Sequence, residues 1–288
     1  MFHQIAIAGF GLIGGSVALA LREAWPRCRI IAIDRSAVVE TATRLGAADA
    51  GGEDLALAGE ADLILLAAPV RQNINVLRDL VSRVRGHAIV TDVGSTKRAM
   101  VEAALHLPER LQFIGGHPLA GAATGGIGSA RPDLFRGRPW ILTPAERDRD
   151  AGVVDRLSGL VAAVGAVPRI MDPTAHDRLM AYLSHLPQLA VSALMQVVGE
   201  RAGREGLSLA GTGLRDTTRL ASSPAGTWRD VTATNVDAVE AAIDDLILAL
   251  QRLKTDLTVG QELQRVFDAA AQWRRTLDEY EVRGHGES

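Results

Sequence analysis

This chain of 288 residues contains a single cysteine and has a formal net charge of only −3. Its single cysteine, Cys28, excludes an intrachain disulfide framework and a zinc site built on cysteines. The 31 basic residues are balanced by 34 acidic ones, so no broad positive field is available to hold a nucleic-acid backbone. The seven histidines lack the spacing of a metal site. We therefore expect neither nucleic acid nor a metal ion as a partner.

Long hydrophobic runs are also absent. The longest apolar stretches, such as residues 61–70, have the length of a buried strand and are too short to span a bilayer. Residues 1–4 lack the cationic start of a secretory peptide, and no small-residue cleavage site follows them. We expect a cytoplasmic protein without a membrane segment. Because only eight residues follow Tyr280, we also expect no appended regulatory domain.

Apolar residues make up 47% of the chain, which is enough for a sizeable core and excludes wholesale disorder. In the first half, short apolar runs alternate with helix-like segments. The expected strands cover residues 5–8, 29–33, 62–68, 87–91, 111–114, 139–142 and 167–171, and the expected helices include 13–24, 36–45 with Ser36 as its N-cap, and 146–164. Continuous apolar strands between amphipathic helices predict a parallel sheet covered on both faces.

The hydrophobic period changes after residue 171. Residues 176–199, 235–257 and 260–280 have apolar side chains at helical spacing, and no strand pattern follows. We therefore expect one domain over residues 1–171 and an all-α domain over residues 172–288. The glycine-rich segment 115–137 is expected to be a loop over a site.

A glycine-rich turn is the strongest local motif. Gly9, Phe10, Gly11, Leu12, Ile13 and Gly14 fit the G-x-G-x-x-G pattern, follow a strand and open a helix. The first glycine permits the tight turn, the second lets a pyrophosphate approach the backbone, and the third lets the helix pack against the strand. The helix N-terminus offers unpaired N–H donors to that anion. The pattern predicts an α/β Rossmann-type doubly wound parallel sheet that binds a dinucleotide.

The identity of the cofactor depends on two residues after the second strand. Asp34 lies twenty residues past Gly14, where its carboxylate can accept a hydrogen bond from a ribose hydroxyl and would repel a 2′-phosphate. This favours NAD over NADP, although the guanidinium of Arg35 could hold that phosphate. Asp34 could also be an ordinary turn carboxylate. Ala68 and Pro69 end the strand beside this turn and complete the expected cofactor site.

Four further motifs follow the glycine-rich turn in order. They are residues 92–97, 115–121, 184–187 and 215–219. The five together resemble the prephenate and arogenate dehydrogenases of tyrosine biosynthesis over nearly the whole chain. The resemblance implies oxidative decarboxylation of prephenate to 4-hydroxyphenylpyruvate with hydride transfer to NAD. It also implies a homodimer formed through the helical domain.

The resemblance assigns the catalytic groups. His117 matches the catalytic histidine of the family, and a neutral imidazole is well suited to accept a proton near pH 7. Ser95 matches the serine that hydrogen-bonds and orients that histidine. Two alternatives remain: His117 could be a structural loop histidine, and Ser95 could be the N-cap of a helix over residues 96–104.

The expected substrate carries two carboxylates, which the planar guanidinium of arginine binds well. Arg215 and Arg219 lie four residues apart, on one face if the segment is helical, and match basic substrate-binding positions of the family. Surface solvation or an ion pair with Asp216 is the alternative. His176 and His185 match family histidines near the substrate, and each could instead be structural.

Two departures from the family pattern bear on substrate choice. Many members that use prephenate have histidine where this chain has Gln188, and some have an acid where it has residues 122–124. A neutral amide can donate a hydrogen bond to a keto acid, so Gln188 favours prephenate. Arogenate, dual specificity and 4-amino-4-deoxyprephenate remain open.

More distant functions are less favoured. A β-hydroxyacid dehydrogenase needs a catalytic lysine in the first helix of the helical domain, where this chain has none. A nucleotide sensor without chemistry would have no use for His117, Ser95 and Arg219 together. The apolar stripe of residues 243–257 forms either internal core or the dimer interface.

Overall fold

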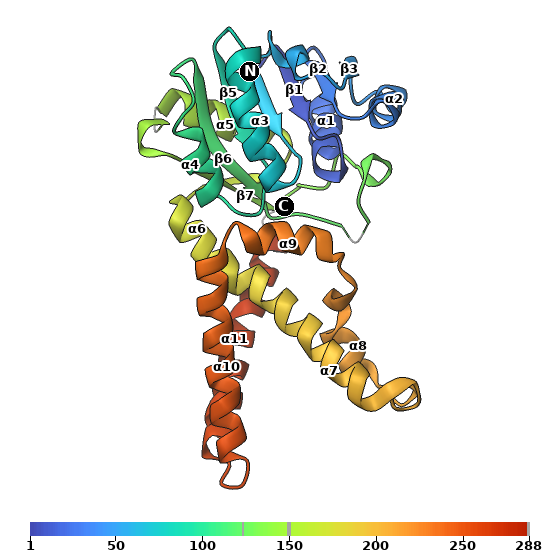
Figure 1. Cartoon of the computed structure of the whole chain (residues 1–288), viewed down its shortest axis with the longest axis vertical. Helices are drawn as coiled ribbons and strands as arrows, with labels where there is room; N and C mark the ends of the chain where they lie inside the picture. Colours follow the sequence, from blue (N-terminus) through green and yellow to red (C-terminus); the bar gives the residue numbers. More distant parts are fainter. Residues whose placement is uncertain (123, 149–150, 287–288) are drawn as a thin grey trace. The chain divides into compact units, whose positions relative to one another are not determined.

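The computed structural model describes residues 1–122, 124–148 and 151–286. Two compact units make up the chain, Met1–Val236 and Asp237–Ser288. An eight-stranded sheet lies at the centre of the first unit, with strand order β3-β2-β1-β4-β5-β6-β7-β8 (Figure 1). The strands are β1 (Gln4–Ala8), β2 (Arg29–Ile33), β3 (Ala50–Gly52), β4 (Leu63–Leu66), β5 (Ala88–Asp92), β6 (Leu111–Pro118), β7 (Pro139–Pro144) and β8 (Val167–Ile170).

Alternating side chains of the strands build two cores, one on each face of the sheet. Ile5 and Ile7 of β1 join the core that includes α1 (Leu12–Ala24), α2 (Ser36–Arg44) and α5 (Ala151–Ala163). Ala6 and Ala8 join the opposite core, with α3 (Val70–Arg83) and α4 (Arg98–Ala104). This confirms the doubly wound α/β architecture. The chain reverses direction across the sheet between β1 and β4, which places the ligand crevice at their carboxyl ends.

One strand pair departs from the expected parallel sheet. β6 and β7 pair antiparallel, with His117 opposite Ile141, whereas every other pair is parallel. The described residues of the connection between them form no α-helix that could carry the chain back to the opposite edge of the sheet, so β7 starts where β6 ends. Apolar runs specify burial but not strand direction. β6 also extends to Pro118, so His117 lies on a strand rather than in the expected loop.

After Ile170, every element in the described part of the chain is a helix. These are α6 (Pro173–Met180), the π-helical turn η4 (Ala181–His185), α7 (Leu186–Ser208), α8 (Thr212–Thr217), the 3₁₀ turn η5 (Arg219–Ser222), α9 (Ala225–Ala233), α10 (Val236–Asp256) and α11 (Gln261–Gly286). Asp172 caps α6 by accepting from the N–H groups of Thr174 and Ala175. The all-helical second half is thus confirmed.

Ser36 differs from its expected role. It is the first residue of α2 rather than its cap, and its hydroxyl donates to the carboxylate of Glu53 at 2.7 Å. The expected helix 146–164 is a 3₁₀ turn (Glu146–Asp148) and α5, and residues 149–150 lie outside the described residues.

The second unit contains most of α10 and all of α11. Asp256 caps α11, because its carboxylate accepts from the N–H of Glu262 at 2.6 Å. The apolar stripe of residues 243–257 is not fully buried within the chain, because Leu250 of α10 and Leu257 directly after it are 56% and 70% exposed. No helix among the described residues combines the length and apolar character that crossing a bilayer requires.

Candidate functional site

Close backbone contacts in the turn between β1 and α1 show why two of its positions require glycine. Gly9 has φ of +95°, and a Cβ there would lie 2.5 Å from the backbone of Ala67. A Cβ on Gly14 would lie 2.1 Å from the carbonyl oxygen of Gly9. Gly11 is different: a Cβ there meets nothing within 4 Å, and no side chain caps α1, whose N-cap it is. The turn therefore leaves the start of α1 open to an anion.

These glycines allow a matched experiment. We expect Gly11→Val to fold normally, because its side chain enters open space, and to weaken NADH binding about tenfold or more by filling the anion site. Gly14→Ala should instead lower the melting temperature, because α1 must move away from Gly9. Fluorescence titration with NADH and thermal unfolding would measure the two effects. Unchanged NADH binding by Gly11→Val would contradict the assignment.

Asp34 lies against the same turn. Its Oδ2 accepts from the N–H of Phe10 at 2.7 Å, and its Oδ1 accepts from the N–H of Arg35 at 2.7 Å. Phe10 was expected to bind the cofactor, but its side chain is fully buried and its N–H is occupied by Asp34. The residue therefore supports the turn rather than a ligand. The Arg35 guanidinium is exposed, 3.9 Å from Asp34.

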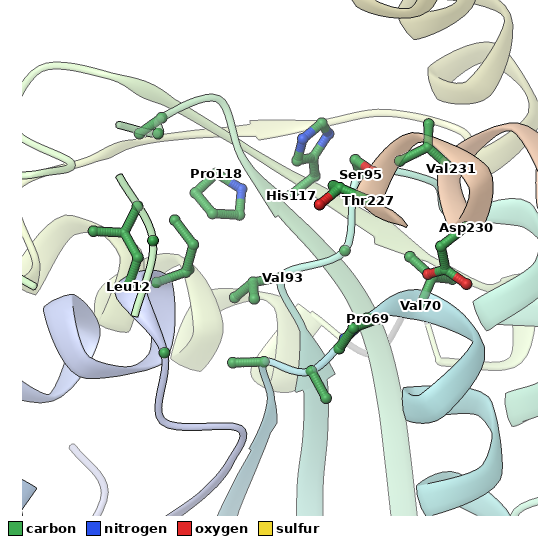
Figure 2. Close-up of a pocket in the computed structure, with 18 of the residues that line it drawn as sticks. Leu12, Pro69, Val70, Val93, Ser95, His117, Pro118, Thr227, Asp230 and Val231 are labelled. Carbon is green, nitrogen blue, oxygen red and sulfur yellow. The ribbon is translucent and has the colours of Figure 1, made fainter. Parts of the chain in front are cut away.

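A cavity of about 640 Å³ opens at the carboxyl edge of the sheet. Figure 2 shows its labelled side chains, which come from α1, from the ends of β4, β5 and β6, and from α9. Expected site residues on its wall are Gly11, Leu12, Ile13, Ala68, Pro69, Ser95 and His117. Ala122 and Gly125 also line it, whereas residue 123 lies outside the described residues. The glycine-rich turn and His117, the expected base, thus line the same cavity.

His117 is held by a chain of hydrogen bonds that the sequence did not reveal. Its Nδ1 lies 2.8 Å from Nε2 of His176, and Nδ1 of His176 lies 2.7 Å from Oδ1 of Asp177. His176 was expected to bind substrate, but its side chain is fully buried and both ring nitrogens are engaged. Burial and the neighbouring His176, Lys97 and His185 hold the pKa of His117 well below its usual value. His117 is therefore a neutral imidazole at pH 7.

Ser95 does not orient His117 in this structure. It lies beside His117 on the cavity wall (Figure 2), but no hydrogen bond joins the two among the described residues. Nor is Ser95 a helix cap. α4 begins at Arg98, and the N–H groups of Lys97 and Arg98 donate to the carboxylate of Asp177 at 2.7 and 2.9 Å. Asp177, which belongs to α6, thus supplies the cap in place of Ser95.

A buried ion pair supports the strand that carries His117. The ammonium of Lys97 contacts the carboxylate of Asp92, and both side chains have no exposed surface. Lys97 also donates to the carbonyl of Gly116 at 2.6 Å, while Asp92 accepts from the N–H groups of Gly94 and Gly116. Burial lowers the pKa of Lys97. The pair ties the ends of β5 and β6 together directly before His117.

Gln188 is not free to read a substrate. Its Nε2 donates to Oγ of Ser192 and to the carbonyl of Leu220, and its Oε1 accepts from Ser223. Both donor hydrogens are therefore used inside the protein. The expectation that this amide donates to a keto acid is wrong. Gln188 instead links α7 to η5. It therefore does not favour prephenate over the alternative substrates.

The two arginines are not on one helical face. α8 ends at Thr217, and Arg219 begins the separate turn η5, so the four-residue spacing does not align them. Both side chains are exposed, and neither lines the cavity of His117. The cavity wall that faces the glycine-rich turn is formed by α9 and not by either arginine.

His185 is buried and neutral. Desolvation lowers its pKa to about 4, and its ring packs edge-on against Trp228. Its Nδ1 lies 3.4 Å from the amide nitrogen of Asn235, which in turn donates to the carbonyl of Asp177 at 2.9 Å. These contacts make His185 part of the packing around Asp177, and like His176 it does not line the cavity.

Sequence reasoning missed the contribution of α9 to the cavity. Thr227 and Asp230 line it, and the carboxylate of Asp230 accepts from the N–H of Arg71 at the start of α3. A second link joins α9 to the sheet end, because the hydroxyls of Thr96 and Thr234 are 2.7 Å apart. No spacing rule connects residues so distant in sequence, so only the fold could reveal them.

The glycine-rich turn, the carboxylate after the second strand and the cavity at the carboxyl edge define a Rossmann-type nucleotide-binding protein. Two family models match the chain: the prephenate dehydrogenase nucleotide-binding domain over residues 17–169 and the prephenate dehydrogenase dimerization domain over residues 172–270.

Individual relatives agree. Prephenate dehydrogenase of Bacillus subtilis is 35% identical over 96% of this chain and 76% of its own length. Arogenate dehydrogenase of Synechocystis superposes with a TM-score of 0.82 at 32% identity, covering 95% of this chain and 99% of the other. Prephenate dehydrogenase of Aquifex aeolicus, solved with hydroxyphenyl propionate and NAD⁺, superposes with a TM-score of 0.83 at 28% identity, covering 98% of this chain and 97% of the other. The chain belongs to the prephenate dehydrogenase family, whose members are NAD-dependent oxidoreductases.

Proposed function

We propose that this protein oxidises prephenate to 4-hydroxyphenylpyruvate with NAD and releases carbon dioxide. The observation that carries the proposal is the single cavity that joins the open start of α1 to the unprotonated imidazole of His117. The similar enzyme of Aquifex aeolicus, solved with NAD⁺ and a hydroxyphenyl compound, supports it. We assign residues 1–171 to the nucleotide-binding domain and residues 172–288 to the helical domain.

The residues present fit NAD. Gly11, Leu12 and Ile13 surround the open N-terminus of α1, which suits a pyrophosphate. The carboxylate of Asp34 suits a ribose diol and disfavours a 2′-phosphate. Ala68 and Pro69 form the adjoining wall. When bound, the nicotinamide supplies the hydride acceptor.

His117 supplies the base. Its imidazole takes the proton of the ring hydroxyl while the carbon that bears this hydroxyl loses hydride. The bond to the ring carboxylate then breaks, its electron pair enters the ring, carbon dioxide leaves, and the oxygen recovers a proton as a phenol. The net change therefore releases no proton. We assign to Ser95, which lies next to His117 on the wall (Figure 2), a hydrogen bond to the same hydroxyl.

The substrate and cofactor can be tested together. Initial rates of reduced-cofactor formation should be measured with prephenate, arogenate and 4-amino-4-deoxyprephenate, each with NAD and with NADP. We expect the highest kcat/KM with prephenate and NAD. A higher value with either other substrate would replace prephenate in this proposal, and a higher value with NADP would contradict the role given to Asp34.

Arg219 is proposed to bind a substrate carboxylate. Its guanidinium is exposed and makes no hydrogen bond or ion pair among the described residues, while Gln188 anchors its turn through Leu220. We expect Arg219→Ala to raise KM for prephenate about tenfold and to change kcat less than about twofold. Arg201→Ala, which removes another exposed arginine, is the matched control. An unchanged KM in steady-state kinetics would exclude Arg219 from the site.

We also propose a homodimer formed through the helical domain, as the dimerization-domain match suggests. The exposed apolar side chains of the helical half support it: Leu183, Val197, Leu250, Leu257, Phe267 and Trp273 are between 56% and 70% exposed. Monomers rarely leave so many large apolar side chains in water. Light scattering should give about twice the chain mass of 30.6 kDa.

A further inference from the structure

The hydrogen bonds behind His117 determine which of its nitrogens carries a proton. An ionised carboxylate accepts hydrogen bonds only, so Asp177 requires a proton on Nδ1 of His176. In a neutral imidazole with that proton, Nε2 is the acceptor. It lies 2.8 Å from Nδ1 of His117, which must therefore be the donor. Nε2 of His117 is left with a lone pair, the form a general base needs.

Asp177 is itself fixed in place. Its carboxylate also accepts from the N–H groups of Lys97 and Arg98, and its carbonyl accepts from Asn235. Asp177 is 2% exposed and His176 is fully buried, so water does not compete for these bonds. The imidazole rings of His117 and His176 meet edge-on at 69°. Rotation of either ring would break a bond and leave a buried polar atom unpaired.

We propose that Asp177 and His176 are positioning residues, which hold His117 in the tautomer with a proton on Nδ1 and a free Nε2. His176 does not line the cavity, and Asp177 acts through it. The inference rests on the proposed function only in treating His117 as the base. The tautomer itself can be measured without any substrate.

Nuclear magnetic resonance reports the tautomer directly. Protein labelled with ¹⁵N-histidine contains seven imidazoles, and the spectra of His117→Asn and His176→Gln assign the two that matter. Long-range ¹H–¹⁵N correlation at pH 7.5 should show His117 protonated on Nδ1. A wild-type His117 protonated on Nε2, or two tautomers in similar amounts, would overturn the proposal.

Asp177→Asn extends the test to catalysis. An asparagine can turn its amide nitrogen toward Nδ1 of His176 at the cost of the bond from the N–H of Lys97, which used the same oxygen. This turn reverses both tautomers and places a proton on Nε2 of His117. We expect the spectrum to show that reversal and kcat with prephenate to fall about tenfold or more, with KM little changed. Asp172→Asn, which alters the cap of the same helix, should leave both readouts unchanged.

The pH profile separates positioning from a merely structural role. His117 faces His176 from α6, Lys97 from the β5 end and His185 from η4, and the Asp177 carboxylate is the negative charge behind them. Removing that charge makes imidazolium less favourable, so the acid limb of kcat/KM should move to lower pH in Asp177→Asn. An acid limb of kcat/KM that stays at the wild-type pH in Asp177→Asn would contradict the proposal.

His176 provides a second pair of variants should Asp177→Asn fail to fold. Gln at position 176 keeps an acceptor for Nδ1 of His117, whereas Leu of similar size removes it. We expect His176→Gln to retain the Nδ1 tautomer and several-fold more activity than His176→Leu. Equal spectra and equal rates would overturn the proposal. If the wild type does not turn over prephenate, the proposed function is refuted. The tautomer measurement does not depend on substrate and would still test the positioning role.

Discussion

Replacement of His117 by asparagine should lower kcat with prephenate by about 100-fold or more while changing KM little, as removal of a general base usually does. Asparagine keeps a polar group of similar size against His176 but cannot accept the hydroxyl proton. In the wild type, burial keeps the imidazole unprotonated, so the acid limb of kcat/KM should lie below pH 6.5. Steady-state kinetics across pH would measure both.

Two controls make this result specific. NADH binding by His117→Asn should equal that of the wild type, because the glycine-rich turn is untouched. Its melting temperature should also change little, because His117 is half-buried at the cavity wall. Turnover within about fivefold of the wild type would remove His117 from the mechanism.

Lys97→Met should lower the free energy of unfolding by about 3–5 kcal/mol, because it leaves the fully buried carboxylate of Asp92 without its counter-ion. Methionine fills similar space, so the loss is electrostatic rather than a cavity effect. Activity should fall as well, since the bond from Lys97 to the carbonyl of Gly116 holds the strand directly before His117. Urea unfolding and kcat on the same preparation would measure the two effects.

The matching double variant, Lys97→Met with Asp92→Asn, isolates the cause. It removes the uncompensated charge and keeps an amide whose single oxygen can still accept from the N–H of one of the two glycines, Gly94 or Gly116. We expect it to recover more than half of the lost stability, because removing both charges is far less costly than removing one. A loss below about 1 kcal/mol for Lys97→Met alone would show that the pair does not support the fold.

The sheet and the nucleotide turn were predictable because local rules decide them. Ile5 and Ile7 alternate with Ala6 and Ala8 between two buried faces, and such uninterrupted apolar runs mark strands covered on both sides. Gly9 and Gly14 stand where any side chain would strike backbone. The direction of β7 was not predictable, because it depends on the route of the chain after Pro118 rather than on the strand residues.

The site was predictable only in part. His117 lies near the end of a strand and lines the cavity, but its partners His176 and Asp177 are about 60 residues away in sequence, and only the packing of α6 against β7 and α4 brings them together. Gln188 failed as a substrate contact because its surroundings offered two internal acceptors, Ser192 and Leu220. Arg215 and Arg219 failed as a helical pair because the chain leaves the helix between them.

In the proposed reaction, His117 couples oxidation of the ring carbon to loss of the ring carboxylate within this one cavity. Prephenate labelled with ¹³C in that carboxylate, incubated with NAD and enzyme, tests it most directly when NADH and labelled carbon dioxide are counted together. We predict equal amounts of both from the wild type and neither from His117→Asn on the same time scale. NADH without labelled carbon dioxide, or equal yields from the two proteins, would show that His117 does not couple the two steps.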